Sequence, residues 1–343
     1  MNLTATFVRS AAFASGTSFL LGILLTPVAA ALARRTGAVA KAKSDRWHSK
    51  PTPMLGGVAF TVAALIAIAV FVPLRRESVI VLSASAFLFV TGLVDDFLHI
   101  QPYQKLAGQF AGAALVAGFG LMLPWTPYRW INLLLTFFWL VGITNAVNML
   151  DNMDGLAAGV AAIAAIFLGF TFLQNEQPGG ALMLVALAGA LVGFLVYNHH
   201  PASIFMGDCG SMFIGFFLAS MALAAHGGGG RSRSIVAVLA VPVLVLVVPI
   251  FDTTFVTVMR KLAGRAASQG GRDHTSHRLV ALGFSERHAV WMLYGFAAAA
   301  GMIAVLVRHA PLLLSLGAIG LFTLVLTLTA LRLARVRVYE NPA

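Results

Sequence analysis

Residues 156–174 read LAAGVAAIAAIFLGFTFLQ, an apolar stretch without a charged side chain. A helix of about 20 apolar residues crosses the hydrocarbon core of a bilayer, so this stretch is long enough to span a membrane. Comparable stretches predict further helices over residues 7–32, 54–73, 79–95, 105–123, 129–147, 181–198, 211–226, 235–258, 288–307 and 311–332. The sequence therefore predicts an all-α, polytopic integral membrane protein with about eleven transmembrane helices in a single transmembrane domain, residues 1–343.

The composition excludes the other common classes of protein. Of the 343 residues, 59% are hydrophobic and 10% are charged. A soluble domain carries about 25% charged residues, and a disordered chain has low hydrophobicity, so neither class fits. The single cysteine, Cys209, excludes an internal disulfide and a multi-cysteine metal site. In the remaining class, a membrane protein, acidic side chains are costly and tend to be functional.

The basic residues predict the orientation of the chain. There are 23 Lys and Arg against 12 Asp and Glu, and the cations are dense in segments 33–53, 259–287 and 333–343. Basic segments stay in the cytoplasm. We therefore predict 33–53 and 259–287 as the main cytoplasmic loops, 333–343 as a cytoplasmic tail and the N-terminus outside, in the inner (plasma) membrane. We expect no nucleic-acid partner, because no DNA-reading fold accompanies the charges.

Polar residues gather in four clusters on the predicted cytoplasmic side. They are Asp95, Asp96 and Lys105; Asn145, Asn148, Asp151, Asn152 and Asp154; Asn198, His199, His200 and Asp208; and Arg272, Asp273, His274, His277 and Arg278. Their common side predicts one shared site. Converging carboxylates need cations, and Mg²⁺ prefers carboxylate oxygens together with substrate phosphates. Aspartates near Lys, Arg and His are typical of phosphoryl transfer.

Single residues of these clusters also have structural interpretations. The two aspartates of the first cluster could end a helix at the lipid headgroups. One residue of the second cluster could cap the helix over 156–174, and Asp208 could cap the helix over 211–226. Asp252 lies within a predicted span, where a structural hydrogen bond and a role in the site fit equally well. These interpretations do not explain why the acids concentrate at one face.

Five segments carry a resemblance to a known family. They are RWHSKPTPMLGG (46–57), DD (95–96) with KLAGQ (105–109), NAVNMLDNMDGL (145–156), YN (197–198) through FMGDCGS (205–211), and HTSHRL (274–279). In this order and spacing they resemble the polyprenyl-phosphate N-acetylhexosamine-1-phosphate transferases of glycosyltransferase family 4, over about residues 20–330. The first segment is nearer the undecaprenyl-phosphate GlcNAc-1-phosphate transferase branch than the branch that uses UDP-MurNAc-pentapeptide.

The resemblance implies a reaction and its partners. The family transfers a sugar-1-phosphate, here GlcNAc-1-phosphate, from a UDP-N-acetylhexosamine to polyprenyl (undecaprenyl or decaprenyl) phosphate and releases UMP. This is the first membrane step of cell-envelope glycans such as lipopolysaccharide or teichoic acid. The resemblance further implies a homodimer, an active site on the cytoplasmic face and Mg²⁺ as the cofactor, with Mn²⁺ as a substitute.

The resemblance also assigns roles to residues. The catalytic carboxylates and metal ligands are Asp208, Asp95 and Asp96, and the catalytic histidines at the diphosphate or sugar are His274 and His277. Lys50 and Lys105 would neutralise phosphates. The other substrate-binding residues are Asn148, Asp151, Asp154, Asn198, Phe205 and Arg278, with the Phe205 ring as a stacking surface for uracil.

Two positions depart from the family pattern, and alternatives remain open. Ser276 stands where a third histidine is usual, which leaves the histidine roles open, and Asn152 stands where a glycine is usual. The alternative within the family is a phospho-MurNAc-pentapeptide transferase of peptidoglycan synthesis. Outside it, the competing classes are an ion-coupled membrane transporter, with Asp252 as the coupling site, and a structural membrane protein.

Overall fold

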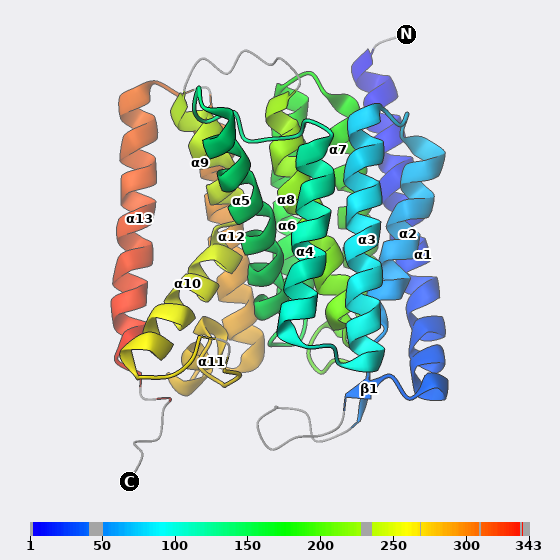
Figure 1. Ribbon diagram of the computed structural model, residues 1–343, viewed down its shortest axis with the longest axis vertical. Coiled ribbons are helices and arrows are strands. Elements are labelled where there is room, and N and C mark those ends of the chain that lie inside the picture. Colours follow the sequence, from blue (N-terminus) through cyan, green and yellow to red (C-terminus); the bar gives the residue numbers. More distant parts are fainter. Residues whose placement is uncertain are drawn as a thin grey trace.

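The computed structural model describes residues 3–40, 51–227, 235–267, 269–308, 310–336 and 338, and these residues are mostly helical (Figure 1). The helices are α1 (Leu3–Thr36), α2 (Gly56–Phe71), α3 (Arg76–Leu98), α4 (Pro102–Gly118), α5 (Arg129–Leu150), α6 (Leu156–Gln174), α7 (Pro178–Asn198), α8 (Gly207–Gly227), α9 (Ile235–Val245), α10 (Val247–Leu262), α11 (Thr275–Ala281), α12 (Glu286–Val307) and α13 (Leu312–Ala334). Two short strands, β1 (Val39–Ala40) and β2 (Thr52–Pro53), pair antiparallel, with Val39 opposite Pro53. The predicted all-α class is confirmed.

Every predicted span overlaps helical structure, and the segment 156–174 coincides with α6 at both ends. Within the described ranges, eight helices are long and apolar enough to cross a membrane: α1, α3, α5, α6, α7, α8, α12 and α13. The chain is therefore an integral membrane protein. The count of eleven spans and the positions of the termini relative to the membrane stay predictions.

One predicted span, residues 235–258, is divided into α9 and α10, which meet at Leu246. Pro249 explains the break, because a proline inside a helix has no N–H to donate and its ring clashes with the carbonyl group four residues earlier. That carbonyl belongs to Val245, the last residue of α9. Helix α10 then runs obliquely towards α11 at the end of the bundle (Figure 1).

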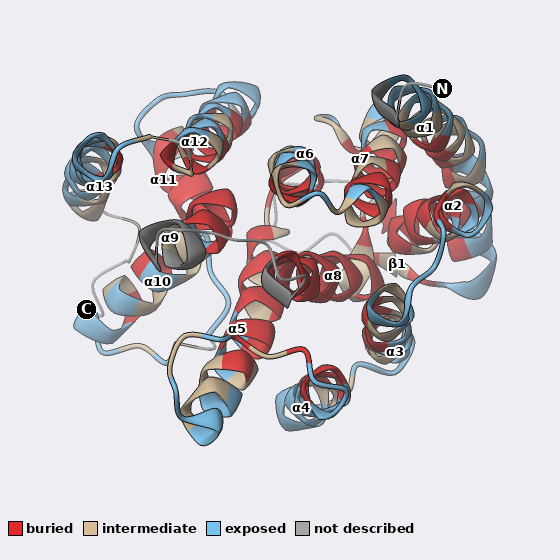
Figure 2. Ribbon diagram, turned by 90° about the horizontal axis from the view of Figure 1, so that it is seen from above, coloured by how far each residue is buried: buried red, intermediate tan, exposed pale blue. Residues whose placement is uncertain are grey.

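Helix α8 forms the centre of the bundle. It lies among α3, α4, α5, α6 and α7 (Figure 2), and 94% of its membrane-spanning window is buried. Helix α13, at the edge, is 11% buried over its window, as expected of a helix with lipid on most sides. The most buried helix begins with Gly207 and Asp208, so the core of the fold fixes the position of this aspartate.

Glycines allow two helices to approach the first turn of α8 closely. A Cβ atom added at Gly57 would lie 2.4 Å from the backbone nitrogen of Gly210, and one at Gly92 would lie 2.4 Å from the carbonyl oxygen of Asp208. A close-packed interior has no room for such an atom. Helices α2 and α3 therefore pack directly against the backbone of α8, and this brings the C-terminal end of α3 to the start of α8.

Candidate functional site

The loop that enters α8 runs beside the segment that follows β2. The backbone nitrogen of Phe205 donates a hydrogen bond to the carbonyl oxygen of Pro53 at 2.8 Å, and that of Gly57 donates to the carbonyl oxygen of Met206 at 2.7 Å. These bonds satisfy backbone groups that have no helical partner. Two segments that are far apart in the sequence therefore form one structural unit.

Gly207 turns the chain into α8. Its φ is +74°, in the left-handed region that glycine adopts without steric cost. A Cβ atom at this position would lie 2.3 Å from the carbonyl oxygen of Met54 and 2.8 Å from Oδ2 of Asp96. Any other residue would therefore be both strained and crowded here. The turn sets the direction of the next side chain, that of Asp208.

Asp96 binds the backbone at the start of α8. Its Oδ1 accepts a hydrogen bond from the nitrogen of Asp208 at 2.7 Å, and its Oδ2 accepts one from the nitrogen of Cys209 at 3.0 Å. The first N–H groups of a helix lack intrahelical partners, and a carboxylate is stabilised by the helix dipole there. Asp96 is 7% exposed and connects α3 to α8. Its role as a metal ligand stays a prediction.

Lys105 joins two carboxylates. Its Nζ lies 2.9 Å from Oδ2 of Asp95 and 2.9 Å from Oδ2 of Asp208. The short connection between α3 and α4 makes this possible: His99 ends α3 in the left-handed region, with φ 50°, and Pro102 begins α4. Lys105, in the first turn of α4, thereby returns to the last turn of α3. The structure brings these three predicted site residues together.

Asn148, near the end of α5, holds Asp208 from the other side. Its Nδ2 donates to Oδ1 of Asp208 and to Oγ of Ser211, the latter at 2.8 Å. Each oxygen of Asp208 therefore has a donor, Asn148 at Oδ1 and Lys105 at Oδ2. Sequence reasoning missed Ser211 as a site residue. The signal was its spacing, because residues three apart lie on the same face of a helix.

Asp95, Lys105 and Asp208 form a carboxylate cluster. Its composition is that of a divalent-cation site that needs substrate to complete it. The oxygens of Asp95 and Asp208 that share Nζ of Lys105 are separated by at most twice 2.9 Å. Mg²⁺ typically binds one or two carboxylates, waters and substrate phosphates, so the donor set suits Mg²⁺ beside a diphosphate. Within the described ranges, no group of three or more His, Cys, Asp and Glu could hold a metal ion alone.

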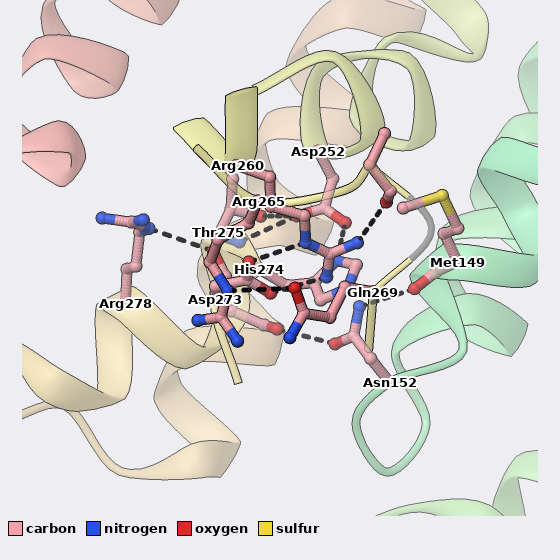
Figure 3. Close-up of polar contacts among 12 residues, drawn as sticks. Met149, Asn152, Asp252, Arg260, Arg265, Gln269, Asp273, His274, Thr275 and Arg278 are labelled. Carbon is pink, nitrogen blue, oxygen red and sulfur yellow. Dashed lines mark hydrogen bonds and ion pairs between the residues drawn. The ribbon is translucent and has the colours of Figure 1, made fainter. Parts of the chain in front are cut away.

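The histidine segment forms a second cluster around Asp252 of α10, at the same end of the bundle (Figures 1 and 3). Asp252 is 0% exposed. Its Oδ2 accepts a hydrogen bond from Nδ1 of His274 at 2.7 Å, and its Oδ1 accepts bonds from the backbone nitrogen and Oγ1 of Thr275 at 2.8 and 2.6 Å. Asp252 thus anchors the start of α11.

Two buried arginines hold the same segment. Arg260 binds Asp273 through two hydrogen bonds, Nε to Oδ2 at 2.8 Å and Nη2 to Oδ1 at 2.7 Å. Arg278 is 0% exposed and donates to the carbonyl oxygens of Asp273 at 3.0 Å, Leu333 at 3.0 Å and Val336 at 2.9 Å. These contacts attach α11 to the end of α13. Substrate binding by Arg278 stays a prediction.

His277 packs against His274 with ring centroids 5.8 Å apart and an interplanar angle of 74°. Burial, followed by the charge of His274, lowers the pKa of His277 to about 4, because a buried imidazolium loses its hydration. His277 is therefore neutral near pH 7. In that state it can take part in the site as a hydrogen-bonding group but not as a cation.

The two residues that depart from the family pattern contact each other. Ser276 Oγ donates to Asn152 Oδ1 at 2.7 Å, and Asn152 Nδ2 donates to the carbonyl oxygen of Met149 at 2.8 Å (Figure 3). Asn152 lies in the turn between α5 and α6, four residues after Asn148, the α5 residue that donates to Asp208. This bridge connects the histidine cluster to the carboxylate cluster.

Two of the predicted substrate-binding residues, Asp154 and Asn198, hold the loop between α7 and α8. Oδ2 of Asp154 accepts a hydrogen bond from the nitrogen of Ala202 at 2.9 Å and lies 3.2 Å from Nδ1 of His200. Asn198 is 2% exposed, and its Nδ2 donates to the carbonyl oxygen of Ile204 at 2.9 Å. These residues shape the loop, and their contacts with substrate stay predictions.

For the remaining predicted site residues, the structure gives the burial of two and does not describe the third. Asp151 and Phe205 are half-buried at the ends of α5 and of the loop before α8, and Lys50 lies outside the described residues. The alternative that a polar side chain caps the helix over 156–174 is wrong. Gly155 occupies the N-cap position of α6, with φ +75°, and no side-chain hydrogen bond caps that end.

Comparisons with known proteins identify the family of this chain. The family model for glycosyl transferase family 4 matches residues 78–226. A probable undecaprenyl-phosphate N-acetylglucosaminyl 1-phosphate transferase of Bacillus subtilis is 32% identical over 315 residues, covering 87% of this chain and 85% of that protein. The decaprenyl-phosphate N-acetylglucosaminephosphotransferase of Mycolicibacterium smegmatis is 33% identical over 322 residues, covering 84% and 79%.

A relative from another branch matches less of the chain. The phospho-N-acetylmuramoyl-pentapeptide-transferase of Limosilactobacillus fermentum is 34% identical over 232 residues, covering 61% of this chain and 72% of that protein. The matched family region, 78–226, contains Asp95, Lys105, Asn148 and Asp208. The chain therefore belongs to glycosyltransferase family 4, the polyprenyl-phosphate N-acetylhexosamine-1-phosphate transferases, and is nearest to its GlcNAc-1-phosphate transferase branch.

Proposed function

We propose that this protein transfers GlcNAc-1-phosphate from UDP-GlcNAc to a polyprenyl phosphate and releases UMP, as the first membrane step of a cell-envelope glycan. The observation that carries the proposal is the cluster of Asp95, Lys105 and Asp208 at the start of the most buried helix. Relatives named for this activity match more than four fifths of the chain, which favours GlcNAc-1-phosphate over the MurNAc-pentapeptide donor and over a transporter.

The reaction exchanges one phosphoanhydride bond for another. An oxygen of the lipid phosphate attacks the phosphorus attached to the sugar, and the bond from that phosphorus to the UMP oxygen breaks. The products are polyprenyl diphosphate GlcNAc and UMP. The attacking phosphate is already ionised near neutral pH, so positioning and charge neutralisation dominate catalysis. Lys105 supplies a fixed cation for this purpose, held between two side chains.

Asp208 and Asp95 are the residues that would hold Mg²⁺, with Mn²⁺ as a substitute. The metal, when bound, neutralises charge on the diphosphate. The ammonium group of Lys105 already occupies a position between these carboxylates, which supports cation binding there. Asn148 fixes Oδ1 of Asp208 through its amide, and Asp96 fixes the backbone of the turn that carries Asp208.

The proposal includes the cellular setting. The site would face the cytoplasm from the plasma membrane, so that a soluble UDP-sugar and a lipid acceptor can meet at the membrane surface. The carboxylate cluster, the histidine cluster and the basic segment 259–287 share one end of the bundle, which supports this orientation (Figure 1). The protein would act as a homodimer.

The test is UMP release by purified protein supplied with UDP-GlcNAc, polyprenyl phosphate and Mg²⁺. We expect Asp208→Asn to lower kcat by roughly 10³-fold, because a charged ligand and a partner of Lys105 are lost together. Glu77→Gln, at the opposite end of α3, is the matched control and should retain activity. No UMP release by the wild type would refute the function, and normal release by Asp208→Asn would remove Asp208 from the reaction.

A further inference from the structure

The two carboxylate oxygens of Asp252 accept hydrogen bonds from two different residues. Oδ1 receives both hydrogen bonds of Thr275, from the backbone nitrogen and from Oγ1. Oδ2 receives the ring nitrogen Nδ1 of His274 at 2.7 Å. The first oxygen thus binds the backbone of α11, whereas the second binds a side chain predicted to work on substrate (Figure 3).

The buried cation on the same helix, Arg260, is paired with a carboxylate other than that of Asp252. The guanidinium group of Arg260, the nearest buried cation on α10, is committed to Asp273 by two short hydrogen bonds. Asp252 is 0% exposed, so water does not compete for its oxygens. A buried carboxylate needs such donors, and here His274 and Thr275 supply them.

The pairing determines which nitrogen of His274 carries hydrogen. A carboxylate accepts hydrogen bonds but donates none, so Nδ1 of His274 must be the donor. Nε2 is then the nitrogen left for other partners. The ring of His277 lies across that of His274 at 74°, which restricts rotation of the imidazole further.

We propose that Asp252 is a positioning residue of the transfer reaction, which fixes His274 with hydrogen on Nδ1 and so reserves Nε2 as the acceptor for a hydroxyl or N–H group of the sugar of the UDP-sugar. This inference rests on the proposed function. Asp252 touches no substrate in this scheme and acts through His274. Its bonds to Thr275 serve the fold alone.

The two tasks can be separated by mutation. Asp252→Asn keeps an oxygen for Thr275 but offers an amide where Oδ2 accepted from His274, and outer-shell partners of this kind are worth about 10- to 100-fold in activity. We therefore expect kcat for UMP release to fall by about that factor. Thr275→Val removes one bond to Oδ1 only and should change kcat by less than about threefold, because the bond to His274 remains.

A double-mutant comparison tests whether Asp252 acts through His274. Residues that act as one unit have strongly non-additive effects, so Asp252→Asn should lower kcat by less than about twofold when His274 is already Gln. A full 10- to 100-fold loss in that background would overturn the proposal, because Asp252 would then act independently of the histidine.

A spectroscopic measurement tests the pairing without turnover. With ¹⁵N-histidine labelling, the resonances assigned through His274→Gln should show hydrogen on Nδ1 in the wild type and a changed pattern in Asp252→Asn. An unprotonated Nδ1 in the wild type overturns the proposal even if the variant does not fold. A protonated Nδ1 in a protein that releases no UMP would instead contradict the proposed function and leave the Asp252–His274 pairing standing.

Discussion

Replacing Lys105 by Met should leave the repulsion between the carboxylates of Asp95 and Asp208 uncompensated, because the ammonium group between them is lost. The oxygens of Asp95 and Asp208 that it bridges each lie 2.9 Å from Nζ. Two unit charges about 5 Å apart repel by about 3 kcal/mol at an effective dielectric constant of about 20, equivalent to roughly 150-fold in an equilibrium or a rate. Methionine keeps the unbranched apolar stem of the side chain and lacks the ammonium group, with its charge and its hydrogen bonds.

Two consequences with different readouts follow. A divalent cation would no longer compete with the ammonium group, so the Mg²⁺ concentration for half-maximal activity should fall. At saturating Mg²⁺, kcat should still fall by roughly 100-fold, because the fixed cation beside the transferred phosphate is gone. Lys105→Arg keeps a charge, so its kcat and its Mg²⁺ requirement should lie between those of the wild type and those of Lys105→Met. Lys261→Met, on the exposed end of α10, controls for the loss of a lysine.

The assay is UMP release in detergent or nanodiscs across a Mg²⁺ titration, with polyprenyl phosphate and UDP-GlcNAc held at saturation. If Lys105→Met kept both the kcat and the Mg²⁺ requirement of the wild type, the electrostatic account of this cluster would be refuted. A lower kcat with a higher Mg²⁺ requirement would show that Lys105 helps the metal to bind, which contradicts the predicted competition.

Three further results are expected. Gly207→Ala should lower the melting temperature and activity more than Gly283→Ala, because both positions have positive φ but only Gly207 also lacks room for a Cβ; equal losses would contradict this. Asn152→Ala and Ser276→Ala should show a coupling of about 1 kcal/mol in a double-mutant cycle of thermal unfolding, and additive losses would argue against the bridge. For His277, the pKa of about 4 lies below the ordinary histidine value of 6.5, so the unfolded chain binds a proton first and stability is lost as pH falls from 6.5 towards 4, by up to about 3 kcal/mol. His277→Gln should flatten the pH dependence of unfolding in that window, and an unchanged slope would contradict the assignment.

The membrane fold was predictable because its signal is local. Length and apolarity define a span, and the segment 156–174 coincides with α6. The division at Leu246 was not predicted, although its cause, Pro249, is visible in the sequence. Hydropathy does not register a proline, because the broken helix remains apolar on both sides of it.

The carboxylate cluster was predictable for a different reason. Asp95, Lys105 and Asp208 lie at predicted span ends on one predicted side, and the structure places them in direct contact. What each oxygen binds could not be predicted. Asp95 and Asp96 are adjacent in the sequence, yet one meets a lysine and the other meets backbone N–H groups, because successive residues of a helix point in different directions.

Buried polar partners set the limit of sequence reasoning. Arg278 and Asn198 are predicted substrate ligands, and the sequence does not show that each also donates hydrogen bonds to backbone carbonyl oxygens in the fold. The contact between Asn152 and Ser276 joins residues 124 positions apart. Such pairs depend on how whole helices pack, and no local pattern encodes them.

The most direct test of the central claim follows the phosphorus that is transferred. Purified wild-type protein would receive polyprenyl phosphate, Mg²⁺ and UDP-GlcNAc labelled at the phosphate attached to the sugar, and the lipid and aqueous phases would then be separated. A sugar-1-phosphate transferase moves the label into the lipid together with GlcNAc and leaves unlabelled UMP. Label that remains in the aqueous phase as UDP, with only the sugar on the lipid, would contradict the account.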